Sequence, residues 1–125
     1  MKFSIPIKLP SLANMSHQHW RRLTELKKAQ KQATSLCLTD AVNRGQVIPP
    51  PPLTIILTRI GPRGLDKQDN LNAAFKYVRD TIAATVGIDD GSDQYEWVYE
   101  QRSGGCGVYG VEVEITSALA RSAAI

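Results

Sequence analysis

Within 125 residues, of which 42% are hydrophobic, there is room for one domain with a modest core. Fifteen basic and twelve acidic residues give a formal net charge of +3, and no apolar run approaches the length of a membrane-spanning helix. The two cysteines, Cys37 and Cys106, lack the spacing of a metal site and are fewer than a secreted disulfide scaffold needs, so we expect a cytoplasmic protein.

An edge strand and a long helix are predicted for the first third of the chain. Residues 2–9 alternate apolar with polar side chains, and Pro6 favours the edge of a sheet because proline lacks a backbone donor. A helical pattern then runs from Ser16 to Asn43. Its expected apolar face comprises Leu23, Leu26, Ala29, Ala33 and Cys37.

The opposite side of this helix is basic. Its residues are Arg21, Lys27, Lys28 and Lys31. Such a row suits a phosphate backbone, although a solvated helix face is the more usual explanation. On the first interpretation, the expected DNA contacts of the helix are Arg21, Arg22, Lys27, Lys28 and Lys31.

Aromatic and basic side chains meet at the beginning of the helix. Trp20 follows His19 and precedes Arg21 and Arg22, which suits either phosphate and stacking contacts with nucleic acid or a packed helix entrance. His17 and His19 are two residues apart and do not share a helix face, so they do not predict a zinc site.

Three further strands are predicted after the helix. Leu53–Ile60 is β-branched and mostly apolar, which is typical of a buried strand. Residues 61–64 form a turn with Arg63, a further expected DNA contact, at its tip. Residues 94–102 and 108–116 alternate and are separated by glycines, so they predict a hairpin with one aromatic face.

The order of these elements indicates the fold class. A β-α-β-α-β-β sequence predicts an α+β fold, in which a mixed sheet has two helices packed on one side. A single domain accounts for residues 1–125, with a loose tail from about 117 to 125. The patterns do not give the order of the strands in the sheet.

The stretch from Leu65 to Asp93 holds six of the chain's twelve acidic residues. They are Asp66, Asp69, Asp80, Asp89, Asp90 and Asp93. In the predicted helix, Asp69, Lys76 and Asp80 fall within roughly 40° of one another at about 100° per residue. The opposite, apolar side comprises Leu71, Ala74, Phe75, Val78 and Ile82. Gly87 is an expected C-cap, after which the chain could bring Asp89 and Asp90 back near the helix start.

Clustered carboxylates on a basic protein favour a divalent metal site for phosphate chemistry. Asp66, Asp69 and Asp90 are the expected ligands, and Lys76 could hold a phosphate or stabilise charge in the transition state. The alternative is structural: Asp66 and Asp69 begin a helix and favour its dipole, Asp80 pairs with Lys76, and Asp89-Asp90-Gly91 is an ordinary turn.

The acidic stretch resembles the RusA-type crossover junction (Holliday junction) endodeoxyribonucleases of phages and prophages. The resemblance lies in Asp69-Asn70-Leu71, in Lys76 and Asp80 as K-x-x-x-D, and in Asp89-Asp90. The family pattern is D-x-D-N-L, a helical lysine, a later helical aspartate and a D-D pair before a strand. The order of the surrounding elements is also similar, over most of the chain.

The resemblance implies a homodimer that binds four-way DNA junctions and cuts them symmetrically with Mg²⁺ or Mn²⁺, in phage or prophage recombination and repair. It makes Asp66, Asp69, Asp90 and Lys76 catalytic, with Asp66, Asp69, Asp89 and Asp90 as metal ligands. Asp80 and Asn70 would support these residues, Asp80 by orienting Lys76. A non-catalytic nucleic-acid-binding dimer on the same fold is the alternative.

The chain departs from the family pattern at two positions. The residue two before Asp69 is Lys67, so the first acid of the motif comes from Asp66 instead. The family lysine lies four residues after the D-N-L aspartate, where this chain has Ala73, and Lys76 comes about one helical turn later. That shift keeps Lys76 on the same helix face.

Overall fold

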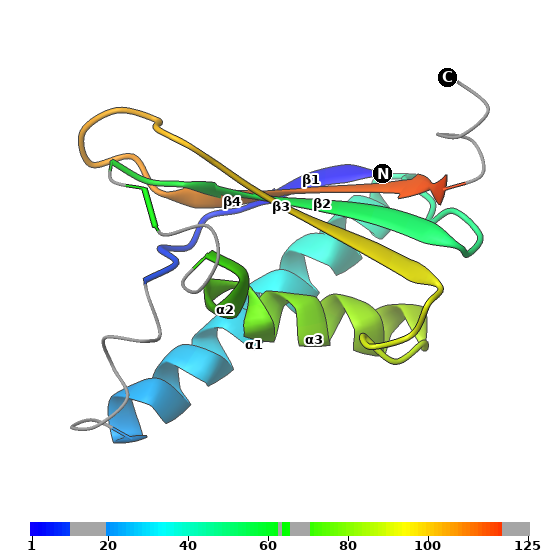
Figure 1. Cartoon of the computed structure of the whole chain (residues 1–125), viewed down its shortest axis with the longest axis horizontal. Coiled ribbons are helices and arrows are strands. Elements are labelled where there is room, and N and C mark those ends of the chain that lie inside the picture. The colour runs from blue at the N-terminus through cyan, green and yellow to red at the C-terminus, as the bar shows by residue number, and fades with distance from the viewer. Residues whose placement is uncertain (11–19, 63, 66–70, 119–125) are drawn as a thin grey trace.

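A computed structural model describes residues 1–10, 20–62, 64–65 and 71–118, and it shows a sheet with helices on one of its faces (Figure 1). The elements are β1 (Lys2–Ile5), α1 (Trp20–Asn43), β2 (Leu53–Ile60), α2 (Asn72–Ala74), α3 (Lys76–Val86), β3 (Tyr95–Arg102) and β4 (Gly110–Ser117). The predicted α+β class, with a mixed sheet and helices on one side, is confirmed. None of the described helices is long and apolar enough to cross a membrane.

The four strands lie in the order β1-β4-β2-β3. Strand β1 is at an edge, as Pro6 indicated, and pairs antiparallel with β4. Strand β2 is central and pairs antiparallel with β4 on one side and parallel with β3 on the other. The predicted hairpin is therefore wrong, because β2 lies between β3 and β4. The glycine-containing segment between them is a crossover past the end of β2 and not a tight turn.

Alternation along the strands places apolar side chains toward the helices and polar ones on the open face. The buried apolar side chains from the strands are Ile5, Leu53, Ile55, Leu57, Tyr95, Val111, Val113 and Ile115. The predicted apolar side of the acidic helix packs against them, and Leu71, Ala74, Phe75, Val78 and Ile82 are all at most 1% exposed. This helix is interrupted at Phe75, so it forms the short α2 and the longer α3.

Helix α1 buries a different face from the predicted one. Its buried residues are Gln30, Thr34, Leu38 and Ala41, whereas Ala29 is exposed and Leu23 and Leu26 are only half-buried. No residue of α1 before Gln30 is buried, because the first part of the helix extends beyond the sheet (Figure 1). The apolar pattern along α1 could not show where the sheet beneath it ends.

Arg59 interrupts the apolar pattern of β2 yet is only 7% exposed. Its Nε donates a hydrogen bond of 2.8 Å to the carbonyl of Leu9, which attaches the segment after β1 to the sheet. Burial lowers the pKa of this guanidinium below its ordinary value, and the charge of Tyr109 opposes that effect in part. Gly61 lies close to this side chain, and a Cβ there would lie 3.0 Å from a guanidinium nitrogen, so a larger residue would displace the guanidinium slightly.

Gly87 ends α3 in a left-handed conformation with φ 88°, as its position predicted. A Cβ at Gly87 would meet nothing within 4 Å, so substitution carries only a conformational cost.

We expect Gly87→Ala to lower the free energy of unfolding by about 1 kcal/mol, and Gly87→Asn by less, because asparagine tolerates this conformation better. Urea denaturation measures both values. Equal stability of the alanine variant and the native protein would contradict this account of the helix end.

Candidate functional site

Some of the predicted site residues lie in the described part of the chain and others lie outside it. Lys76 and Asp80 lie one turn apart on α3, and Asp89 and Asp90 lie in the turn that follows it. Outside the described residues are Arg63, Asp66, Asp69 and Asn70. The described part of the candidate site consists of α3, the turn after it and the elements that contact them.

Carboxylates of α3 and of the following turn meet in one depression of about 400 Å³. Asp80, Asp89 and Asp90 line it, together with Lys31 from α1. A neighbouring depression of about 440 Å³ is also lined by Lys31 and Asp80. The fold thus brings a lysine of the predicted basic face beside the predicted acidic residues, as the DNA-binding interpretation required.

The side chain of Asp90 forms an ion pair with Arg79. Nε of Arg79 lies 3.1 Å from Oδ2 of Asp90, and both side chains are about 30% exposed, at 30% and 28%. This nitrogen is buried without hydrogen-bond geometry to any partner, so the contact is electrostatic. A second guanidinium nitrogen of Arg79 donates to the hydroxyl of Tyr99 at 2.9 Å. Arg79 thereby links β3 to the acidic turn.

Side chains of β3 hold the same turn by hydrogen bonds to its main-chain carbonyls. The indole Nε1 of Trp97 donates to the carbonyl of Asp90, and the hydroxyl of Tyr95 donates to the carbonyl of Ile88, both at 2.9 Å. The Tyr95 and Trp97 rings pack together with their centroids 4.9 Å apart. The aromatic side chains predicted on one face of a hairpin therefore brace the acidic turn.

These contacts change the proton affinities of two groups. Burial opposes the charged form of Arg79, but the hydrogen bond to Tyr99 and the charges of Asp90 and Asp80 outweigh it, so the pKa of Arg79 is raised. Burial, and then the negative charges of Asp90 and Asp89, raise the pKa of Tyr95. Arg79 therefore remains a cation beside Asp90, and Tyr95 remains a hydrogen-bond donor, at neutral pH.

Two lysines converge on Tyr77, which lies just inside α3. The ammonium of Lys27 is 5.8 Å from the centre of the tyrosine ring, and that of Lys76 is 5.9 Å from it. The first comes from α1 and the second from α3, so each helix places one cation near this ring. No ion pair joins Lys76 to Asp80 in the described part of the molecule.

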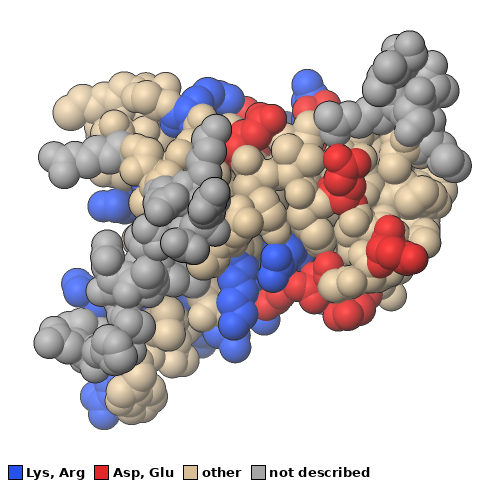
Figure 2. All heavy atoms as spheres, viewed as in Figure 1, with Lys and Arg blue, Asp and Glu red and all other residues tan. Residues whose placement is uncertain are grey.

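Basic and acidic atoms occupy adjoining areas of the surface over the helices (Figure 2). Of the predicted basic residues, Lys27 and Lys31 lie toward α3, while Arg21, Arg22 and Lys28 are exposed elsewhere on α1. The predicted face is thus divided, and only part of it borders the carboxylates. Sequence reasoning missed Arg79, because nothing in the spacing links it to an aspartate on a separate turn.

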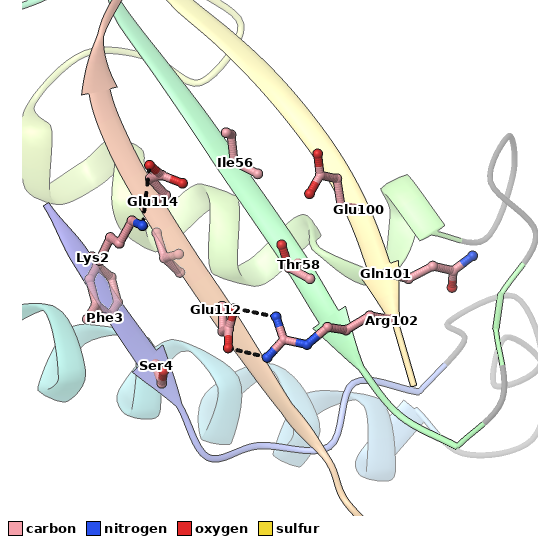
Figure 3. A pocket seen from close by; sticks show the side chains of 11 residues that line it. Lys2, Phe3, Ser4, Ile56, Thr58, Glu100, Gln101, Arg102, Glu112 and Glu114 are labelled. Carbon is pink, nitrogen blue, oxygen red and sulfur yellow. Dashed lines mark hydrogen bonds and ion pairs between the residues drawn. The ribbon is translucent and has the colours of Figure 1, made fainter. Parts of the chain in front are cut away.

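A further depression, of about 500 Å³, lies on the open face of the sheet (Figure 3). Two of the three carboxylates that line it have partners: Glu112 is paired with Arg102, and Glu114 lies 3.8 Å from Lys2, while Glu100 is the third. The hydrogen bond from Arg102 is the main cause of the lowered pKa of Glu112. This polar face is typical of a solvated sheet and is separate from the acidic turn.

The donor chemistry of the acidic turn suits Mg²⁺, which prefers carboxylate oxygens. Within residues 1–10, 20–62, 64–65 and 71–118, however, no group of three or more His, Cys, Asp or Glu side chains could hold a metal ion. A metal site at Asp90 therefore depends on Asp66 and Asp69, which lie outside this part.

Comparisons with protein-family models, with curated proteins and with solved structures found no match to this chain.

Replacing Arg79 tests the contacts that hold the acidic turn. Arg79→Gln removes the cation facing Asp90 and the donor to Tyr99, so we expect the free energy of unfolding to fall by about 2 kcal/mol. Arg79→Lys keeps the positive charge but lacks the planar guanidinium with its several donors, so its free energy of unfolding should fall by less. Urea denaturation provides the values, and near-ultraviolet circular dichroism follows the packing of Trp97.

The matched control is Lys2→Gln, which removes an exposed ion pair on the open face and should cost less than about 0.5 kcal/mol. Equal losses in Arg79→Gln and Lys2→Gln would show that the Arg79 contacts do not stabilise the turn.

Proposed function

We propose that the protein is a RusA-type, Mg²⁺- or Mn²⁺-dependent endodeoxyribonuclease that cuts four-way DNA junctions as a homodimer. It would act in the cytoplasm, in phage or prophage recombination and repair. The observation that carries the proposal is the depression where Asp80, Asp89 and Asp90 meet Lys31. Phosphodiester cleavage needs carboxylates for a metal and a cation for phosphate on one surface, and this depression has carboxylates beside a lysine, to which Asp66 and Asp69 would add the remaining metal ligands.

The sequence motif and the fold support the same proposal in different ways. Asp69-Asn70-Leu71 and Asp89-Asp90 resemble the family motif, in which the D-D pair comes before a strand, and here Asp89 and Asp90 come before β3. The α+β arrangement with a mixed sheet is compatible with the fold that the resemblance implies.

In this mechanism, Asp66, Asp69 and Asp90 would hold the metal, with Asp89 beside them. The bound ion would neutralise the scissile phosphate and lower the pKa of an attacking water. Arg79 holds Oδ2 of Asp90 in place. Lys76 and Lys31 would bind phosphate oxygens and stabilise the charge that develops during cleavage. Arg21, Arg22, Lys28 and Arg63 would contact the DNA arms.

A non-catalytic nucleic-acid-binding dimer is the second candidate. It is favoured by the ion pair of Asp90 with Arg79, because a carboxylate that already has a cationic partner can serve a structural role alone. This protein would bind junctions with a steep salt dependence and gain nothing from Mg²⁺. A junction-cleavage assay with and without Mg²⁺ separates the two candidates.

Asp90→Asn tests the catalytic assignment. We expect cleavage of a synthetic four-way junction in Mg²⁺ to fall by at least about 100-fold, because the amide cannot replace a metal-ligating carboxylate. Junction binding in Ca²⁺ should stay within about twofold, since the basic residues are unchanged.

The control is Asp93→Asn, which makes the same chemical change at an exposed position of the same turn and should leave cleavage intact. If Asp90→Asn cut the junction at the native rate, the metal-site assignment would be wrong.

Removing two lysines tests whether α1 and α3 bind one nucleic acid together. The double variant Lys27→Gln, Lys76→Gln should lower the slope of log affinity against log salt by about 2, because each phosphate that is no longer neutralised contributes roughly 0.9. A variant with the same charge change, Lys2→Gln with Arg44→Gln, alters residues that border a different depression, near β1. Titration of a labelled junction at several salt concentrations gives the slopes, and equal changes in both variants would exclude a localised site.

A further inference from the structure

We propose that the projecting first part of α1 is a stacking platform for unpaired nucleic-acid bases, with Trp20 as the stacking side chain. This inference rests on the DNA-binding part of the proposed function and is independent of cleavage. We define the arm as residues 20–29, which hold no buried side chain. The arm extends away from the sheet at the end of α1 opposite its connection to β2 (Figure 1).

The exposure of Trp20 is the first observation. Its side chain is 73% exposed, so the packed helix entrance considered from the sequence does not occur. The other tryptophan, Trp97, is partly buried and donates its indole proton to the carbonyl of Asp90. An indole ring that is this open can stack on a planar partner, and burying its large apolar surface lowers the free energy of the complex.

The guanidinium next to Trp20 is the second observation. The Cζ atom of Arg21 lies 5.6 Å from the centre of the indole ring, within the range of a cation–π contact. An aromatic ring beside a guanidinium offers one flat surface for a base and charged donors for the adjoining phosphate. Proteins that bind single strands combine these two features.

The charge of the arm identifies the class of partner. Arg21, Arg22, Lys27 and Lys28 outnumber Glu25, so the arm carries a net charge of +3, four minus one. If the partner were a protein with an apolar groove, the arm would need several exposed apolar side chains to fill it. Within residues 20–29, Trp20 is the only large apolar side chain that is exposed. One aromatic ring among cations is complementary to a base attached to phosphates, and unpaired bases are available for stacking where base pairing is interrupted.

The experiment compares binding of the full-length protein to a labelled oligothymidylate and to a blunt duplex of the same length. We expect Trp20→Leu to weaken oligothymidylate binding by about tenfold at every salt concentration, with an unchanged salt slope, because stacking carries no charge. Binding to the duplex should change less than twofold. Trp20→Phe should retain most of the affinity, since its ring still stacks. Arg21→Gln should lower the salt slope instead.

Fluorescence and a matched variant isolate the role of the indole ring. Oligothymidylate should quench the tryptophan emission of the native protein but not that of Trp20→Phe, in which only Trp97 remains. Leu36→Ala, which removes another exposed apolar side chain of α1, at 70% exposure, is the matched control and should bind like the native protein. Because Trp20 is outside the core, its variants should keep the native melting temperature.

The proposal would be overturned by equal losses on the oligothymidylate and on the duplex, or by quenching that persists in Trp20→Phe. It would also be overturned if Trp20→Leu changed the oligomeric state and left affinity intact, because the arm would then be an interface between copies of the chain.

Discussion

The parallel pairing of β2 with β3 determines where the acidic turn lies. A parallel neighbour requires a crossover connection, and here α2 and α3 supply it before the chain returns to the start of β3. The turn that completes this return holds Asp89 and Asp90. Its position is then fixed by Tyr95, Trp97 and Tyr99, whose side chains share the helix-facing side of β3. Without the parallel pairing, the acidic turn would not lie beside α1 and its lysines.

The sequence predicted those features that depend on one element at a time. The buried side of α3, the left-handed Gly87 and the edge position of β1 are each set by local periodicity or by one residue's backbone preference. The strand pairing was missed because alternation assigns faces and says nothing about neighbours. The buried face of α1 was missed because it depends on where the sheet ends, which is a property of other parts of the chain.

The candidate site was predictable to a similar extent. The acidic residues and the basic helix were identified by composition, but their meeting in one depression depends on the packing of α1 against α3. Arg79 went unrecognised because its partners, Asp90 and Tyr99, lie on a turn and a strand beyond its own helix. A carboxylate has two oxygens, and Arg79 contacts Oδ2. The same ion pair can therefore orient Asp90 while its other oxygen contacts a ligand. Groups that bind one oxygen of a metal-ligating carboxylate orient it in the same way.

Helix α1 contributes residues to both surfaces on which the two proposals are based. Trp20 and Lys31 are eleven residues apart, which corresponds to roughly 16 Å along an α-helix. A duplex advances about 3.4 Å per step along each strand, so a ligand that reaches both residues must extend over about five nucleotide steps. A mononucleotide or a free phosphate is too short to do so. In the proposed function, one nucleic-acid strand would span this distance, with its phosphates along the lysines and a base at the exposed indole.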